Sequence, residues 1–303
     1  MTRRALALAA ATVACAAALV GAGCGERKSE AAAPADGAPA ARLVATADHG
    51  AEVLLDERVA PGRSVMDALQ GVTPVETSYG GGFVSSMLGR GSSSSPPADW
   101  FFYVNGYESP VGARAADLQA GDVAWWDHRA WQGMQSVRAV VGAWPEPFVR
   151  GAGGSRPTVA ADAPLAGALR AAGARVGGGE RAFRARVGTD AALSARDGAW
   201  RAIGGDPGGS RLAGGIRDGQ VVLMPPGGGS PAPVPGARAV AVLVPAGPAP
   251  SDGALLAVAG LDAASAGAAA GTIAARPDVL SLRYAVAFDA AGQPVRAAGR
   301  TGP

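Results

Sequence analysis

The sequence of 303 residues has only two cysteines and two histidines, and Lys28 is its only lysine. Cys15 lies in the apolar N-terminal segment, so the rest of the chain holds Cys24 alone and cannot form an internal disulfide. His49 and His128 are far apart, and no group of His, Cys, Asp and Glu has the spacing of a metal site. These absences exclude a disulfide scaffold and lead us to expect no metal centre.

Neither charge is in excess. The chain carries 27 basic and 25 acidic residues, and a leader that removed Arg3 and Arg4 would leave 25 of each. A nucleic-acid-binding protein concentrates basic residues on one face, so we expect no nucleic-acid partner. Catalytic signatures are also missing, since residues 80–82 (GGG) lack the Lys-Ser/Thr pair of a phosphate-binding loop and no Gly-x-Ser-x-Gly elbow occurs. The sequence therefore predicts a protein that is not an enzyme and needs no cofactor.

The N-terminal apolar run is short for a membrane span. Residues 5–20 are almost entirely apolar and follow Arg3 and Arg4, whereas a spanning helix needs about 20 apolar residues. Small residues at 21–23 then lead to Cys24 and an abrupt change to polar residues. A basic head, an apolar middle and small residues before a cleavage site are typical of a secretory signal peptide.

The small residues before Cys24 resemble a bacterial lipobox, although Gly21 stands where the usual box has leucine. The resemblance implies a signal peptide of residues 1–23, an acylated Cys24 and anchorage in the lipid bilayer at the extracytoplasmic face of the cell membrane. The alternatives are a plain signal peptide cut near Ala22, which would leave Cys24 as a free thiol, and an uncleaved anchor. Residues 24–41, rich in Ala and Pro, are expected to form a flexible tether.

Residues 42–150 form the better defined of two predicted domains. Residues 42–148 contain 12 of the 16 aromatic residues of the chain, and aromatic side chains dominate core energetics. The order of expected elements predicts an α+β domain of β-grasp type. In chain order these elements are strands at 42–48 and 51–57, a helix capped by Ser64, and strands at 99–104 and 123–128.

Two turns separate the later strands. Asn105 and Gly106 supply the positive backbone angles of a tight hairpin, and Gly121 and Asp122 precede the last strand. The order of motifs around these turns resembles the transcobalamin-like C-terminal domain of bacterial surface proteins. The matching pieces are residues 64–69 (SVMDAL), 82–84 (GFV), 100–106 (WFFYVNG), 118–122 (LQAGD) and the aromatic strand ending at Trp126.

That resemblance implies a soluble-ligand-binding β-grasp fold and offers no catalytic residue to transfer. Vertebrate relatives supply half of a cobalamin pocket, so the resemblance names a corrinoid-like small molecule as the possible ligand. Trp125 and Trp126 are adjacent in a strand and must point to opposite faces. One of them could therefore join other aromatics in an exposed binding surface; the alternative is that a helix or the second domain covers it. The candidate ligand-binding residues are Tyr79, Trp100, Tyr103, Tyr107, Trp125, Trp126 and Trp131.

Residues 157–303 are expected to form a second α+β domain of unknown role, with poorly ordered loops near 204–236. The expected elements are helices at 162–176, 197–202 and 263–275, the last capped by Asp262, and strands at 182–187, 219–224, 237–244, 254–261 and 280–288.

The leading functional hypothesis is a membrane-anchored lipoprotein that binds a small ligand and assists the uptake of a corrinoid-like cofactor by a transporter. The alternative is a structural or adaptor lipoprotein that binds another envelope protein through its aromatic face. A concave pocket would favour the first hypothesis, and a flat aromatic surface would favour the second.

Overall fold

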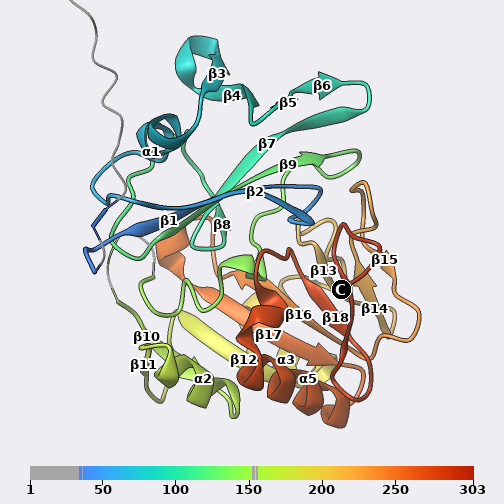
Figure 1. Cartoon of the computed structure of the whole chain (residues 1–303). Coiled ribbons are helices and arrows are strands. Elements are labelled where there is room, and N and C mark those ends of the chain that lie inside the picture. Colours follow the sequence, from blue (N-terminus) through green and yellow to red (C-terminus); the bar gives the residue numbers. More distant parts are fainter. Residues whose placement is uncertain (1–33, 36, 152–153, 155) are drawn as a thin grey trace, which may run out of the picture.

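The computed structural model describes residues 34–35, 37–151, 154 and 156–303. The predicted signal peptide, Cys24 and most of the predicted tether lie outside these residues. Over the described residues the chain has an α+β fold made of two stacked halves, the N-terminal half (residues 41–151) and the C-terminal half (residues 156–303) (Figure 1). No helix in this part of the chain is long and apolar enough to cross a membrane.

The N-terminal half is built on a six-stranded sheet with one α-helix on one face. Its elements are β1 (Ala41–Ala47), β2 (Glu52–Val59), α1 (Val65–Val72), β3 (Val75–Ser78), η1 (Tyr79–Gly81), β4 (Phe83–Met87), β5 (Arg90–Gly91), β6 (Ser93–Ser94), β7 (Pro97–Val104), β8 (Tyr107–Glu108), β9 (Val123–Ala130) and η2 (Val141–Ala143). The strand order is β2-β1-β9-β7-β6, and β8 pairs with β7. β1 runs parallel to β9, which is the pairing of first and last long strands expected for a β-grasp arrangement.

Local signals explain these elements. The Ser64 side chain accepts a hydrogen bond from the Asp67 backbone N–H and caps α1. Asn105 and Gly106 have φ of 51° and 84° and close the β7–β8 hairpin. The strands β3, β4 and β5 form a separate small sheet that projects from the N-terminal half (Figure 1).

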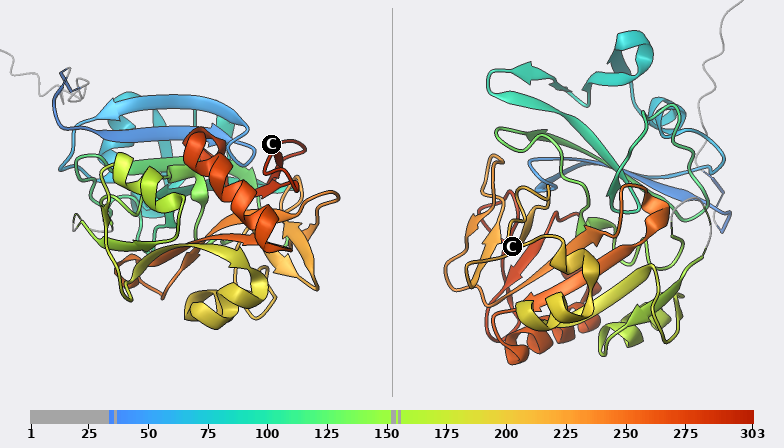
Figure 2. Two further views of the ribbon diagram at one scale, coloured as in Figure 1. Left: turned by 90° about the horizontal axis from the view of Figure 1, so that it is seen from below. Right: turned by 180° about the vertical axis from the view of Figure 1, so that it is seen from behind.

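The C-terminal half is a seven-stranded sheet covered by helices on both faces. Its elements are β10 (Thr158–Ala161), α2 (Leu165–Ala171), β11 (Arg175–Val176), β12 (Phe183–Thr189), α3 (Asp190–Arg196), α4 (Gly198–Arg201), β13 (Gly214–Arg217), β14 (Gln220–Leu223), β15 (Ala232–Pro233), β16 (Ala239–Pro245), η3 (Pro250–Asp252), β17 (Ala254–Gly260), α5 (Ala263–Ala275), η4 (Pro277–Leu280), β18 (Val286–Phe288) and β19 (Pro294–Ala297). The order is β11-β10-β12-β17-β16-β18-β19. Helices α2 and α5 lie on one face, and α3 and α4 lie on the other (Figure 2).

Three predictions for the C-terminal half were wrong in part. The helix expected at 162–176 is shorter, because α2 ends at Ala171 and residues 175–176 form β11. Residues 280–284 do not continue a strand, because Leu282 has φ of 52° and its N–H donates to the Gly142 carbonyl of the other half. The strand predicted at 219–224 is present as β14, and residues 204–236 also contain the short strands β13 and β15, where loops were expected. The sequence signal for the β13–β14 hairpin is the pair Asp218-Gly219. These two residues adopt φ angles of 51° and 68° and form the turn between the strands.

The two halves share one hydrophobic core. Val44, Tyr103 and Trp125 of the N-terminal half pack in the same buried cluster as Val240 and Tyr284 of the C-terminal half. The neighbouring Trp126 lies in a different cluster, beneath α1. The two tryptophans therefore face opposite sides of the sheet, and the C-terminal half covers one of them.

A buried hydrogen-bond network lies within this shared core. One oxygen of the fully buried Asp127 carboxylate accepts from the Thr46 hydroxyl (2.6 Å) and the Gly50 N–H (3.0 Å). The other oxygen accepts from the Tyr284 hydroxyl of the C-terminal half (2.9 Å). Thr46 in turn accepts from the Trp125 indole N–H (2.8 Å). The network ties the two halves together through groups that have no contact with solvent.

His49 packs at the same junction, with its ring edge-on to the Tyr284 ring and the two ring centroids 5.3 Å apart. Burial, together with the nearby Arg129 and Arg300 charges, lowers the pKa of His49 from 6.5 to about 3. Since the folded-state pKa lies below the ordinary value, the unfolded chain binds the proton first as the pH falls. His49 therefore contributes stability that is present above about pH 6.5 and is lost as the pH falls toward 3.

We expect His49→Asn to remove this pH dependence, which amounts to at most about 1.4 kcal/mol per pH unit. Asn tolerates the left-handed backbone at this position, where φ is 61°. The measurement is the free energy of unfolding in urea between about pH 7 and pH 4. His128→Asn, which keeps His49, serves as the control and should retain the slope. An identical slope in His49→Asn and the original chain would refute the assignment.

Candidate functional site

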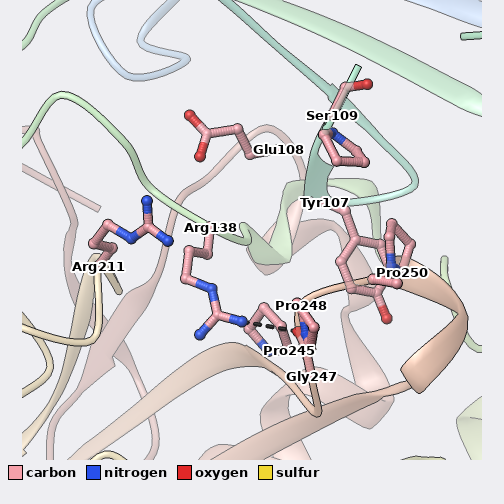
Figure 3. A pocket seen from close by; sticks show the side chains of 11 residues that line it. Tyr107, Glu108, Ser109, Arg138, Arg211, Pro245, Gly247, Pro248 and Pro250 are labelled. Carbon is pink, nitrogen blue, oxygen red and sulfur yellow. Dashed lines mark hydrogen bonds between the residues drawn. The ribbon is translucent and has the colours of Figure 1, made fainter.

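A pocket of ≈ 190 Å³ opens where the two halves meet (Figure 3). We call it the junction pocket. One wall comes from residues 107–110 and 138 of the N-terminal half, and the other comes from Arg211 and residues 245–250 of the C-terminal half. Residues 246–253 form the loop between β16 and β17, so the pocket depends on how the two halves are stacked.

Backbone hydrogen bonds bring three charged residues of the pocket side by side. The Glu108 N–H donates to the Arg138 carbonyl (3.0 Å), and the Arg138 N–H donates to the Arg211 carbonyl (2.9 Å). Tyr107 forms an antiparallel bridge with Ala139 in the same ladder. Arg211 has φ of 56°, a left-handed conformation that costs free energy for a side chain with a Cβ atom. The ladder thus holds three distant segments of the chain in a fixed order.

The two arginines of the pocket have no carboxylate partner. Arg138 donates from Nη2 to the Gly247 carbonyl (2.8 Å), and Arg211 donates from Nη1 to the Ser136 hydroxyl (3.4 Å). Neither guanidinium belongs to an ion pair with any residue that the structure describes. Figure 3 shows both on one side of the pocket, with Tyr107 on the other.

Glu108 is the one acidic side chain that lines the junction pocket. Its carboxylate accepts a hydrogen bond from the Ser136 hydroxyl, which itself accepts from Arg211. Burial raises the pKa of Glu108, and this effect outweighs the lowering by Ser136 and by the charges of Arg129 and Arg211. The pocket therefore holds two permanently charged guanidinium groups and one carboxyl group, whose pKa is raised.

Tyr107 supplies the second polar feature. Its side chain is 4% exposed, and its hydroxyl is buried without a hydrogen-bond partner in the protein. Burial also raises the pKa of this hydroxyl, which keeps it protonated. An unsatisfied buried hydroxyl costs about 1–3 kcal/mol, so this hydroxyl does not stabilise the fold.

Three further hollows share lining residues with one another or with the junction pocket. One of ≈ 300 Å³ shares Arg138, Pro245, Gly247 and Pro248 with it, and one of ≈ 120 Å³ shares Tyr107, Ser109, Pro110 and Pro250. An open hollow of ≈ 560 Å³ shares residues 198–199 with the ≈ 300 Å³ hollow. The hollows follow the loop at 245–250 around the junction.

The structure does not gather the predicted ligand-binding aromatics on one surface. Trp100 and Trp126 lie in the core beneath α1, and Tyr103 and Trp125 lie beneath the C-terminal half. Tyr79 is 91% exposed on the projecting small sheet. A helix and the C-terminal half thus cover most of the aromatic residues, which was the alternative given by the sequence.

The two remaining aromatics have separate environments. Trp131 is half-buried and donates its indole N–H to Asp99 (2.8 Å). Tyr107 alone among the seven lines the junction pocket.

The predicted turn residues lie close to the site. The Asn105 side chain donates to Asp122 (2.8 Å) and accepts from the Val123 N–H (2.9 Å), which fixes the turn. Gly106 and Gly121 have φ of 84°. Asn105 and Asp122 line the ≈ 120 Å³ hollow beside Tyr107.

Sequence reasoning missed Glu108, Arg138 and Arg211. Each is a single charged residue outside any motif, and only the backbone ladder between distant segments reveals that they meet. No group of three or more His, Cys, Asp or Glu side chains within the described ranges could hold a metal ion.

Comparison with known proteins gives a partial match. A family model described as "Domain of unknown function (DUF4430)" matches residues 62–130, from just before α1 to the end of β9. Among solved structures, a "putative metal binding protein" from Ruminococcus gnavus ATCC 29149 is 10% identical, with a TM-score of 0.26. The likeness covers 31% of this chain and 98% of that protein, and it is too weak to carry a conclusion. No curated protein matches the chain.

We expect Tyr107→Phe and Tyr284→Phe to have opposite effects on stability. The first removes a buried hydroxyl that has no partner, so the free energy of unfolding should stay constant or rise by up to about 1 kcal/mol. The second removes one of the three donors to the buried Asp127 carboxylate and should lower the free energy of unfolding by roughly 1.5–3 kcal/mol. Urea unfolding followed by Trp fluorescence measures both. Equal losses in the two variants would mean that the protein itself already satisfies the Tyr107 hydroxyl.

Proposed function

We propose that the protein is a lipid-anchored, extracytoplasmic protein that binds a small ligand in the junction pocket. One observation carries the proposal: two guanidinium groups that have no carboxylate partner, those of Arg138 and Arg211, line the junction pocket together with Tyr107. Binding sites commonly lie between domains and place a few polar groups in a mainly apolar wall. The proline-rich loop at 245–250 provides such a wall.

The transcobalamin-like resemblance supports a ligand-binding role. Its motifs fall within or next to residues 62–130, the segment that the family model matches. The vertebrate relatives supply one half of a cobalamin pocket, and here too the β-grasp half supplies only one wall of the pocket.

A corrinoid is the ligand implied by that resemblance, but the pocket is narrow for one. Its ≈ 190 Å³ lies below the roughly 300–1,000 Å³ of pockets that enclose drug-sized molecules. We therefore propose a ligand smaller than a corrinoid. Corrinoid uptake through this protein would require the loop at 245–250 to move.

The adaptor hypothesis has less support, because it relied on an exposed aromatic face. The large hydrophobic side chains that are exposed in the described ranges are Val53, Tyr79 and Val111, and only Tyr79 is aromatic. Catalysis has little support as well, since no histidine lines the junction pocket and the Ser109 hydroxyl donates to the Val111 carbonyl. We accordingly propose binding without chemistry.

The membrane anchor has its own test. We expect the original chain in the membrane fraction and Cys24→Ser in the soluble fraction, because the thioether to diacylglycerol requires the cysteine sulfur. Cell fractionation and the mass of the purified chain measure the anchor. Cys15→Ser is the matched control, since the predicted signal peptide that contains it is removed. Membrane retention of Cys24→Ser with the leader still attached would instead indicate an uncleaved anchor.

Ligand binding can be tested with the purified full chain and a collection of small metabolites that includes cyanocobalamin, screened by ligand-detected NMR. We expect saturable binding of a small compound that slows amide hydrogen exchange at residues 107–110 and 245–250. Exchange in the projecting sheet at 75–91 should not change. Absence of any binder, or protection only outside the junction, would overturn the proposal.

A further inference from the structure

We infer that the junction pocket binds a small organic anion whose carboxylate or phosphate group lies against Arg138 and Arg211. The inference rests on the proposed function and specifies its ligand class. The argument combines the unused hydrogen-bonding capacity of the two guanidinium groups, the charge balance of the pocket and the apolar part of its lining.

Both guanidinium groups retain unused donors. A guanidinium has five N–H donors in a planar fork, and the structure gives each of these two arginines one side-chain hydrogen bond, to Gly247 or to Ser136. The planar fork matches the oxygens of a carboxylate or phosphate, and such charge-assisted pairs are about twice as strong as neutral hydrogen bonds. The backbone bond from Arg138 to Arg211 keeps the two residues adjacent before any ligand binds.

Other arginines of the molecule form the ion pairs that Arg138 and Arg211 lack. Arg184 is paired with Asp197, and Arg186 and Arg196 share Asp162. Those guanidinium groups stabilise the fold and are already neutralised. Arg138 and Arg211 form no such ion pair, and the Glu108 carboxylate that lines the same pocket accepts a hydrogen bond from the Ser136 hydroxyl.

The pocket therefore favours negative charge. Arg138 is half-buried, which reduces the screening of its charge by solvent. A neutral ligand would leave both cations without a counter-charge, whereas an anion would neutralise them. Glu108 limits the site to a ligand whose anionic group faces the arginines rather than the carboxylate.

The apolar part of the lining defines the rest of the ligand. The rigid rings of Pro110, Pro245, Pro248 and Pro250 line the pocket together with Tyr107. At roughly 30 Å³ for each water molecule, the pocket holds about six waters. A compact apolar body with one anionic end fits this space.

The test uses the purified full chain and isothermal calorimetry with matched acid and amide pairs, namely benzoate with benzamide and phenylacetate with phenylacetamide. Phenyl phosphate separates phosphate from carboxylate recognition. We expect at least one acid or phenyl phosphate to bind at least about tenfold more tightly than its neutral counterpart, because one charge-assisted bond is worth about 1.5–3 kcal/mol. Affinity should fall as the ionic strength rises.

Variants locate the interaction. Arg138→Gln and Arg211→Gln should each weaken binding of the acid about tenfold or more and leave binding of the amide unchanged. Arg138→Lys, which keeps the charge but not the planar fork, should recover part of the affinity. Arg170→Gln removes an exposed guanidinium of α2 that does not line the pocket, and it should have no effect. Unfolding curves for each variant establish that the fold is intact.

The outcomes separate the two proposals. Equal binding of acids and amides, with exchange protection at 107–110, would overturn the anion inference and leave the ligand-binding proposal standing. Acid binding that survives both glutamine variants would also overturn it. Failure of every probe and of the wider metabolite collection would overturn both proposals.

Discussion

The fold depends on the hydrogen bond between the Asp127 carboxylate and the Tyr284 hydroxyl, which crosses the junction between the two halves. A carboxylate removed from water is strongly destabilising unless it is fully hydrogen-bonded. Asp127 meets this condition with donors from Thr46, Gly50 and Tyr284, and the fully buried Arg129 provides a nearby positive charge. Because one of the three donors comes from the C-terminal half, separation of the halves would leave a buried acceptor unsatisfied. The network therefore specifies one relative position of the halves, which hydrophobic contact alone would specify less sharply.

That single position creates the junction pocket. Arg211 reaches Arg138 only when the C-terminal half is in place, and the loop at 245–250 closes the other side of the pocket. The aromatic residues contribute indirectly. Tyr103, Trp125 and Tyr284 contact one another through tilted and edge-on ring pairs with centroids 5.4–5.6 Å apart, and they fill the core beside the polar network. The aromatic richness of the N-terminal half thus stabilises the junction, while charged and proline residues form the pocket.

Sequence reasoning succeeded where the signal is local. Ser64 and Asp262 each cap the helix that follows, and Asp262 accepts from the Ser265 N–H at 2.8 Å. It failed where tertiary contacts decide the conformation: Leu282 turns because its N–H meets a carbonyl of the other half. The pocket belongs to this second class. No spacing in the sequence links Glu108, Arg138 and Arg211, because their proximity comes from a backbone ladder between segments that are distant in the chain.

Two buried tyrosines differ in whether the protein itself satisfies the hydrogen bonding of their hydroxyl groups. Tyr284 is fully buried, and its hydroxyl donates to the Asp127 carboxylate. The hydrogen bonding of this hydroxyl is therefore satisfied within the protein. Tyr107 is almost as buried, yet its hydroxyl has no partner and its ring lines a hollow. Folding gains nothing from that hydroxyl, since a phenylalanine would pack equally well without the cost of an unsatisfied donor. The two guanidinium groups that line the same pocket, those of Arg138 and Arg211, have no carboxylate partner, and an anionic ligand would supply one.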